Sequence, residues 1–224
     1  MPYSKGTETK NCILRAATEL FFEEGYSATT MRQISDRAGT NLGLLKYYFN
    51  GKGELALTVY RNLRGSFDAL VDESDLRPES EDMFLFSSAV ELYLCLESPE
   101  YGRFYHEISG EPEVHTKIQE KISAALMRHA ANRGLTDHYI VLACTSIAAI
   151  KPAIVGYARS CPPEKYIPTG EYLLYYLRQQ LHFLGEDGVR AEDFVALLEK
   201  YYITVAKNFT PIMVKIGEAP NFAV

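Results

Sequence analysis

The residues most suited to contacts with another molecule lie close together near the N-terminus, in the segment LGLLKYY of residues 42–48. A lysine such as Lys46 can donate hydrogen bonds to O6 or N7 of guanine, and a tyrosine such as Tyr47 can contact a phosphate or the methyl group of thymine. Gly43 lowers helix propensity by about 1 kcal/mol relative to alanine. A glycine at this position is explained more readily by the close approach of a DNA backbone or base edge than by folding. The alternative for Lys46 and Tyr47 is a solvated helix face. The segment therefore predicts a surface that contacts DNA.

Two further residues are suited to phosphate. Thr30 and Arg32 stand at the start of the preceding segment MRQISDR, residues 31–37. Free amide groups at the start of a helix and a basic side chain both attract phosphate. Such contacts make binding dependent on salt without selecting a base sequence.

Three helices must position these side chains, and apolar spacing predicts them. The first helix carries apolar residues at i, i+1, i+4, i+7 and i+8 on one face, namely Ile13, Leu14, Ala17, Leu20 and Phe21. Gly25 ends this helix as a C-terminal cap. Thr30 can cap the second, short helix, which turns Ile34 and Ala38 inward.

A tight turn then leads into the third helix. Gly39 supplies the turn because glycine takes a positive φ freely, and Thr40 or Asn41 can cap the helix that follows. Two residues of this helix should face inward: either Leu44 or Leu45, and either Tyr48 or Phe49. Two short helices joined through an Ala-Gly turn and packed on a longer helix form a helix-turn-helix unit, whose second helix fits the major groove of DNA.

In this N-terminal segment the sequence resembles the TetR family of transcriptional repressors. The matching positions, in order along the chain, are Ile13, Leu14, Ala16, Ala17, Leu20, Phe21, Gly25, Tyr26, Thr29, Thr30, Ile34, Ala38, Gly39, Gly43, Leu45, Tyr47, Tyr48, Phe49, Lys52, Glu54 and Leu55. The resemblance covers about residues 8 to 60. The sequence departs from the family at Thr40, where valine is usual, and at Lys46, where tyrosine is frequent.

The resemblance adds further DNA contacts to those above. It implies that Tyr48 and Lys52 contact phosphates, and Lys10 stands where the family often carries a basic residue. For Tyr48 the alternative is packing against the first helix. The predicted DNA-contacting set is Lys10, Thr30, Arg32, Thr40, Asn41, Leu42, Gly43, Lys46, Tyr47, Tyr48 and Lys52.

The remainder of the chain is also helical in its patterning. No segment shows sustained period-two alternation, and leucines recur at helical spacing between Leu173 and Leu184. Residues 137–158 are apolar on nearly all sides, which predicts a buried central helix that Pro152 kinks or interrupts. We therefore expect an all-α fold, with a three-helix helix-turn-helix domain in residues 1–53 and a larger helical ligand-binding and dimerisation domain in residues 54–224.

The larger domain is expected to bind a small-molecule effector of unknown identity. Aromatic and polar residues in apolar surroundings are the candidates, because a buried hydroxyl or imidazole needs a partner that a ligand can supply. These residues are Tyr93, Tyr105, His106, Tyr139, Cys144 and Tyr157. The alternative for each of them is packing in the core.

The last two amphipathic helices are the candidates for a dimer surface. Two such helices from each subunit form an intermolecular four-helix bundle, as the resemblance also implies. The residues expected there are Tyr172, Leu173, Tyr176, Leu177, Gln180, Leu184, Phe194, Leu198, Tyr201, Tyr202 and Val205. The alternative is that both helices pack only inside their own subunit.

The net charge limits where DNA can bind. The 224 residues include 23 Lys or Arg and 29 Asp or Glu, a net charge of −6, which argues against a protein that coats nucleic acid or an anionic membrane. Residues 1–53, however, hold seven basic and five acidic residues, a net of +2, and the remainder holds −8. Only the N-terminal domain should therefore approach DNA.

Several other classes of protein are disfavoured. We expect no signal peptide, no membrane span and hence a cytoplasmic protein, because the N-terminus lacks a basic segment followed by an apolar one and no apolar run approaches about 20 residues. The four cysteines form no CxxC pair, and we expect neither a metal nor a cofactor. No HExxH, GxSxG or phosphate-binding loop is present, so an enzyme is a remote alternative.

The leading hypothesis is a homodimeric regulator that binds double-stranded operator DNA, most simply a repressor that a small-molecule effector releases from the operator. An activator is possible with the same residues. The alternative within the same fold is a DNA-binding protein without a small-molecule effector, regulated by a protein partner.

Overall fold

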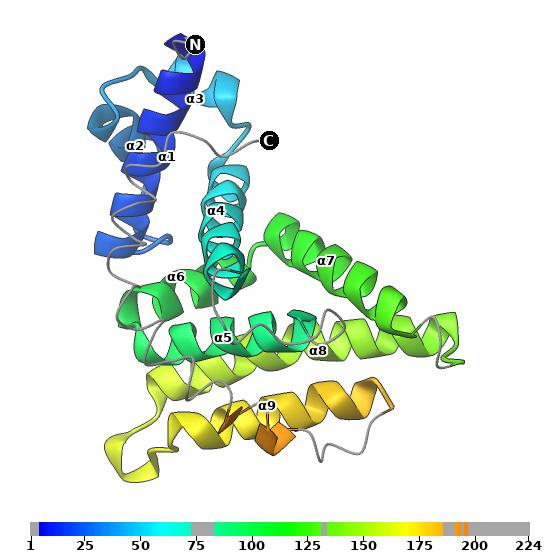
Figure 1. Ribbon diagram of the computed structural model, residues 1–224. Helices are drawn as coiled ribbons and strands as arrows, with labels where there is room; N and C mark the ends of the chain where they lie inside the picture. The colour runs from blue at the N-terminus through cyan, green and yellow to red at the C-terminus, as the bar shows by residue number, and fades with distance from the viewer. Residues whose placement is uncertain (1–4, 73–82, 131–133, 186–190, 194, 197–224) are drawn as a thin grey trace.

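A computed structural model describes residues 5–72, 83–130, 134–185, 191–193 and 195–196, and the described residues form helices and no strand. The helices are α1 (Lys5–Glu23), α2 (Met31–Arg37), α3 (Leu42–Tyr48), α4 (Lys52–Asp72), α5 (Met83–Glu97), α6 (Pro99–Ser109), α7 (Pro112–Ala130), α8 (Asp137–Ser160) and α9 (Thr169–Phe183), with a 3-10 turn at Pro163–Lys165. Figure 1 shows α1, α2 and α3 gathered at one end, which we call the head, with the body of α5 to α9 at the other end and α4 running between them. The expectation of an all-α fold with a helix-turn-helix domain and a larger helical domain is confirmed.

The head folds as its local sequence signals require. Thr30 caps α2 in a capping box with Gln33, and Asn41 rather than Thr40 caps α3 by accepting a hydrogen bond from the amide of Leu44 at 2.7 Å. Gly39 has a φ of +63° in the turn between α2 and α3, a conformation that glycine adopts without strain. Caps and turn together fix where each short helix begins.

The apolar residues of the head meet in one core. Ile13, Phe21 and Ile34 are fully buried. In α3 the inward residues are Leu45 and, at its end, Phe49, which are 0% and 2% exposed. This arrangement holds α3 across α1 and α2 with its other face toward solvent.

In the body, α8 is the central helix and packs against α5, α6, α7 and α9. It continues unbroken through Pro152, because buried residues on both sides of the proline, such as Lys151 and Ile154, anchor the helix in the core. Of the two expectations for Pro152, an interruption of the helix is wrong, and a kink stays a prediction. Burial on most sides is also wrong in part, since Val141 and Leu142 are 57% and 67% exposed.

By length and composition alone, α8 could cross a membrane, and within the described residues it is the one helix that could. A core helix of a globular domain passes the same test, and α8 contacts four other helices and carries the buried Lys151. We interpret it as a core helix.

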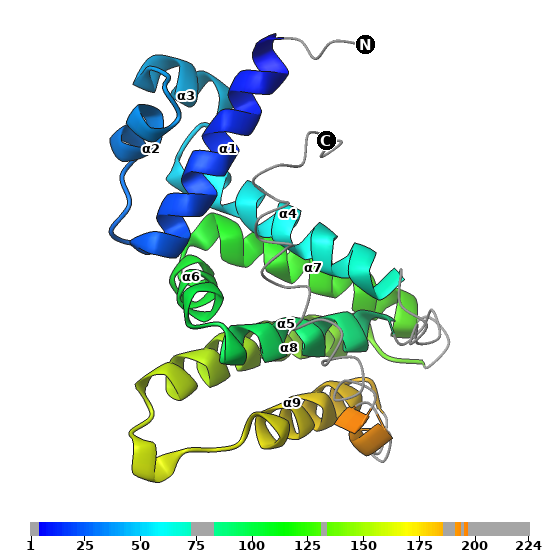
Figure 2. The ribbon, with the colours of Figure 1, turned by 60° about the vertical axis from the view of Figure 1, so that its left-hand side comes forward.

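α9 packs against α5 and α8 on the side of the body away from the head (Figures 1 and 2). Its apolar stripe faces this core, so most of the dimer-surface residues expected on it are buried inside the subunit, namely Leu173, Tyr176, Leu177, Gln180 and Leu184, each at most 2% exposed, while Tyr172 is half-buried. The structure thus corrects the expectation for α9: the stripe is used internally. The remaining candidates, Phe194, Leu198, Tyr201, Tyr202 and Val205, lie outside the residues whose side chains are described.

Candidate nucleic-acid interface and internal cavity

The solvent face of α3 carries the residues that the sequence predicts to contact DNA. Tyr47 is 80% exposed, its ring touching that of Tyr48 edge-on at 5.3 Å between centroids, and Lys46 and Gly43 are exposed beside it. Leu42 is 36% exposed on the same helix. Because the buried Leu45 fixes the rotation of α3, this polar and aromatic face points away from the head.

The starts of α2 and α3 lie next to this face in the sequence and are exposed as well. The Thr30 hydroxyl donates to Oε1 of Gln33 at 2.7 Å, and Arg32 is exposed in the first turn of α2. Thr40 is half-buried and Asn41 exposed. Thr30 and Asn41 are thus the caps that position their helices, and Arg32 is a cation that can reach outward.

Lys52 has a structural role that the sequence does not reveal. Its ammonium donates to the carbonyl oxygens of Tyr26 at 2.9 Å and Thr29 at 3.1 Å, and lies 4.2 Å from the centre of the Tyr26 ring. The first residue of α4 therefore holds the loop between α1 and α2. Lys10, half-buried, has its ammonium 6.0 Å from the centre of the Phe49 ring.

A second connection between head and body comes from α6. The Arg103 guanidinium donates to the carbonyl oxygens of Phe22 at 2.7 Å and Glu23 at 3.2 Å, at the end of α1. Glu107, one turn further along α6, accepts a hydrogen bond from the amide of Ser27 at 2.8 Å. The end of α1 and the middle of the loop after it are thus held to the body by Arg103 and Glu107.

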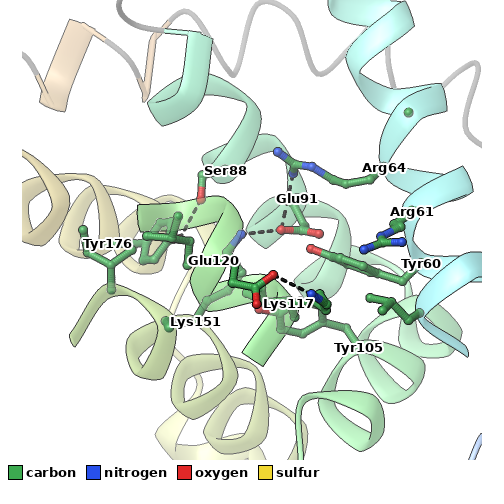
Figure 3. Close-up of a pocket in the computed structure, with 16 residues that line it drawn as sticks. Tyr60, Arg61, Arg64, Ser88, Glu91, Tyr105, Lys117, Glu120, Lys151 and Tyr176 are labelled. Carbon is green, nitrogen blue, oxygen red and sulfur yellow. Dashed lines mark hydrogen bonds and ion pairs between the residues drawn. The ribbon is translucent and has the colours of Figure 1, made fainter. Parts of the chain in front are cut away.

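An open cavity of about 470 Å³ lies between α4 and helices α5 to α9 (Figure 3). This volume lies within the range of about 300–1,000 Å³ typical of small-molecule sites. Its lining is Leu57, Tyr60, Arg61, Arg64, Gly65, Ser88, Glu91, Tyr105, Lys117, Ile118, Glu120, Ile122, Ile147, Ala148, Lys151 and Tyr176.

Of the six candidate ligand-binding residues, only Tyr105 lines this cavity. His106 is exposed and Tyr157 is 46% exposed; Tyr93, Tyr139 and Cys144 are half-buried or buried elsewhere in the body. These five residues do not line this cavity, and their predicted contact with a ligand stays a prediction. Apolar spacing shows which residues face inward, but it does not show where helices packed against one another leave a space.

Glu91 is the centre of a buried charge cluster at the cavity wall (Figure 3). Its Oε2 lies 2.5 Å from Nζ of Lys151 and 3.3 Å from Nη1 of Arg64, and its Oε1 accepts a hydrogen bond from the Tyr101 hydroxyl at 3.2 Å. The side chain of Tyr60 bonds to it as well. All three charged side chains are at most 9% exposed.

The cluster sets the charge state of its members. Burial alone would raise the pKa of Glu91, but the ammonium of Lys151 and the guanidinium of Arg64, with hydrogen bonds from Lys151 and Tyr60, outweigh burial and lower it to about 2. Burial lowers the pKa of Lys151, but the Glu91 carboxylate outweighs it and holds this pKa above its ordinary value. Both groups are therefore charged at neutral pH. Within the described residues, no cluster of His, Cys, Asp and Glu is arranged to hold a metal ion.

The sequence similarity to a known protein family lies mainly in the head and the start of α4. The family model described as "Bacterial regulatory proteins, tetR family" matches residues 13–59, which span α2, α3 and parts of α1 and α4. The chain is 35% identical over 75 residues to the HTH-type transcriptional regulator TtgR of Pseudomonas putida, covering 34% of each protein. It is 31% identical over 118 residues to the HTH-type transcriptional activator FasR of Mycolicibacterium smegmatis, covering 50% of this chain and 52% of FasR.

These alignments span between about a third and a half of the length of the two curated relatives. A solved structure, that of RolR in complex with its ligand resorcinol, superposes over 85% of this chain and 94% of RolR with a TM-score of 0.57 at 18% identity. At this identity the likeness concerns the fold, which includes the body as well as the head.

Proposed function

Because the chain carries an N-terminal helix-turn-helix domain of the TetR family, we propose that it is a DNA-binding transcriptional regulator. The observation that carries the proposal is the face of α3, where Tyr47 is 80% exposed next to Lys46 on a helix whose rotation is fixed by buried Leu45. The family and the relatives described above are transcriptional regulators rather than enzymes. Cytoplasmic localisation belongs to the same proposal, because operator DNA lies there.

The proposed contacts divide by role. Lys46 and Tyr47 contact base edges in the major groove, with Gly43 allowing close approach. Arg32 and the amide groups at the starts of α2 and α3 contact phosphates, as do Lys10 and Tyr48. Thr30, Thr40, Asn41 and Leu42 lie at these helix starts, where the backbone approaches the duplex. Lys52 acts through the loop that it holds, because its ammonium is already bonded to two carbonyl oxygens.

We propose further that the regulator is a homodimer with α8 at its interface. The exposed side of α8 carries Val141, Leu142 and Tyr157, which are 57%, 67% and 46% exposed. Apolar residues grouped on one helix favour burial against a second copy. Two heads held in this way would reach half-sites about 34–36 Å apart, one turn of the duplex.

The cavity supports an effector-responsive regulator. α4 contributes Tyr60, Arg61 and Arg64 to the cavity, while Lys52 at its start holds the head. A ligand that favours one position of α4 would therefore change the spacing of the two heads. Shifting that equilibrium from 99:1 to 1:99 requires about 5.5 kcal/mol of differential binding. Release from the operator, as by a repressor, is the simplest outcome.

A gel-shift experiment tests the proposal. The full-length protein is titrated against fragments from upstream of its own gene and the neighbouring genes, in moderate salt and with excess nonspecific DNA. We expect one or a few fragments to be retarded at much lower protein concentration than the rest, because specific sites bind typically 10³-fold or more tighter than nonspecific DNA. Equal retardation of every fragment would contradict a sequence-specific regulator.

A further inference from the structure

We propose that the cavity selects an effector that is a hydrophobic monocarboxylate, with its carboxylate bound between the ammonium of Lys151 and the hydroxyl of Tyr105. This inference rests on the proposal that the cavity is the effector site, and it adds the chemical class of the ligand. It follows from three features of the cavity: its charge balance, the hydrogen-bonding capacity of its wall and its apolar remainder.

The charge balance favours an anion. Four basic side chains line the cavity, Arg61, Arg64, Lys117 and Lys151, against the two carboxylates of Glu91 and Glu120. Both carboxylates are already paired, Glu91 with Lys151 and Arg64, and Glu120 with Lys117 at 2.7 Å. A cationic ligand would have to displace a cation of the protein from one of them. Arg61, in contrast, is exposed at the cavity and forms no ion pair within the part of the chain that the structure describes.

Two donors at the wall have capacity to spare. An ammonium carries three N–H groups, and that of Lys151 makes a single hydrogen bond to the described residues, to Glu91. It lies 5.9 Å and 5.5 Å from the centres of the Tyr105 and Tyr176 rings (Figure 3). The Tyr105 hydroxyl has no hydrogen-bond partner among the described residues, whereas Tyr176 is already paired with Ser88 at 2.7 Å. Burial raises the pKa of Tyr105, so its hydroxyl stays protonated and can donate.

The rest of the wall is apolar. Leu57, Ile118, Ile122, Ile147 and Ala148 line the cavity together with the tyrosine rings. Such a surface holds a hydrocarbon or aromatic body by burying its area. A ligand with one anionic end and an apolar remainder therefore satisfies both parts of the lining.

Direct binding to the purified full-length protein, in the absence of DNA, tests the inference by calorimetry. The probes are straight-chain alkanoates of six to fourteen carbons, phenylacetate and naphthalene-2-carboxylate, each compared with the alcohol and the amine of the same skeleton. We expect at least one carboxylate to bind at least about tenfold more tightly than its alcohol and its amine, as a charge-assisted hydrogen bond implies. An alcohol or amine that binds as tightly as its carboxylate, or no binding by any carboxylate up to millimolar concentration, would overturn the inference.

Two substitutions assign the binding to the proposed atoms. Tyr105→Phe removes a hydroxyl that has no partner within the described structure, so the fold should persist while carboxylate affinity falls about tenfold. Tyr139→Phe, on α8 and away from the cavity lining, is the matched control and should bind like the wild type. Glu91→Gln removes the anion that competes for Lys151 and should strengthen carboxylate binding, seen also as a larger rise in Tm on adding the probe. Unchanged affinity in Tyr105→Phe, or weaker binding in a folded Glu91→Gln protein, would contradict the assignment.

Because these measurements contain no DNA, they are independent of the DNA-binding proposal. Carboxylate binding without any effect on DNA retardation would leave the ligand class standing and would contradict effector control. Suppose instead that the protein retards DNA but binds none of the carboxylates, and that none of them changes the retardation. That result would overturn the ligand class and leave the DNA-binding proposal standing.

Discussion

At the scale of single residues, Glu91 both stabilises the body and determines the charge at the wall of the cavity. Its carboxylate receives hydrogen bonds or ion pairs from Tyr60 and Arg64 on α4, Tyr101 on α6 and Lys151 on α8. Removing one partner of a buried charge cluster leaves the others without compensation and is strongly destabilising, by about 3–5 kcal/mol. The same cluster sets the electrostatic potential that a ligand meets.

The ionisation of Glu91 predicts how stability depends on pH. Its pKa in the folded state is about 2, below the ordinary value of 4.5. A group whose pKa is depressed by folding stabilises the folded state above its unfolded pKa and loses that contribution as the pH falls toward the folded pKa. We therefore expect the free energy of unfolding, measured by urea denaturation, to fall between about pH 4.5 and 2. This fall should be smaller in Glu91→Gln.

Glu120→Gln is the matched control for this experiment. Glu120 also lines the cavity and pairs with a lysine, but its side chain is 57% exposed, and exposed pairs contribute little to stability. This variant should keep the pH profile of the wild type. A Glu91→Gln profile parallel to that of the wild type would show that Glu91 is not the titrating group.

At the scale of helices, sequence patterning was sufficient for the head and insufficient for the body. Caps and turns are local, so Thr30, Gly39 and the pair Thr40 or Asn41 could be assigned from neighbouring residues alone. Spacing also shows that α9 has an apolar stripe, but it does not show whether the stripe faces the subunit's own core or a second subunit. Only the three-dimensional packing shows that residues such as Leu177 are used internally.

Two of the cavity residues could have been recognised in the sequence by their charge, although apolar spacing alone does not identify them. Glu91 and Lys151 each interrupt a long apolar segment, and a charged residue in such a segment is buried only when it is paired. Two isolated charges of opposite sign in apolar helices therefore predict each other as partners. The remaining lining, such as Arg61 or Ile118, depends on where α4 and α7 lie and could not be predicted from the sequence.

The apolar face of α8 gives a test of the proposed dimer. Replacing both Val141 and Leu142 with glutamate places charge on residues that are exposed in the single subunit, so the subunit should stay folded. In a dimer interface the same charges would be buried without partners and would dissociate it. We expect light scattering after size exclusion to give the 25.3 kDa of one chain for this variant and twice that mass for the wild type.

Tyr47→Glu is the control for the dimer test, because it introduces charge at an exposed aromatic residue on the head rather than the body. It should leave the dimer intact. A wild-type protein with the mass of one chain, or a doubly substituted protein that remains a dimer, would show that α8 does not form the interface.

At the scale of the whole molecule, the head and the body differ in net charge and are connected by a few specific contacts. Residues 1–53 carry a net charge of +2 and the rest carries −8, which supports the proposal that DNA binds the head. α4 and α6 connect the head to the body through Lys52, Arg103 and Glu107. For the proposed regulator, a weakly basic head predicts low nonspecific affinity and greater dependence on the proposed base contacts of α3.

The measurement that tests this account most directly is the affinity of the double variant Lys46→Ala/Tyr47→Ala for a fragment that the wild type binds specifically. The matched control is Lys165→Ala/Tyr166→Ala, an exposed Lys-Tyr pair in the body beyond α8. By fluorescence anisotropy, the α3 variant should lose its preference for the specific fragment over nonspecific DNA, with its free energy of unfolding within about 1 kcal/mol of the wild type. The control should retain that preference. A folded α3 variant that keeps the wild-type preference, or a control that loses it, would contradict the claim that the exposed face of α3 recognises DNA.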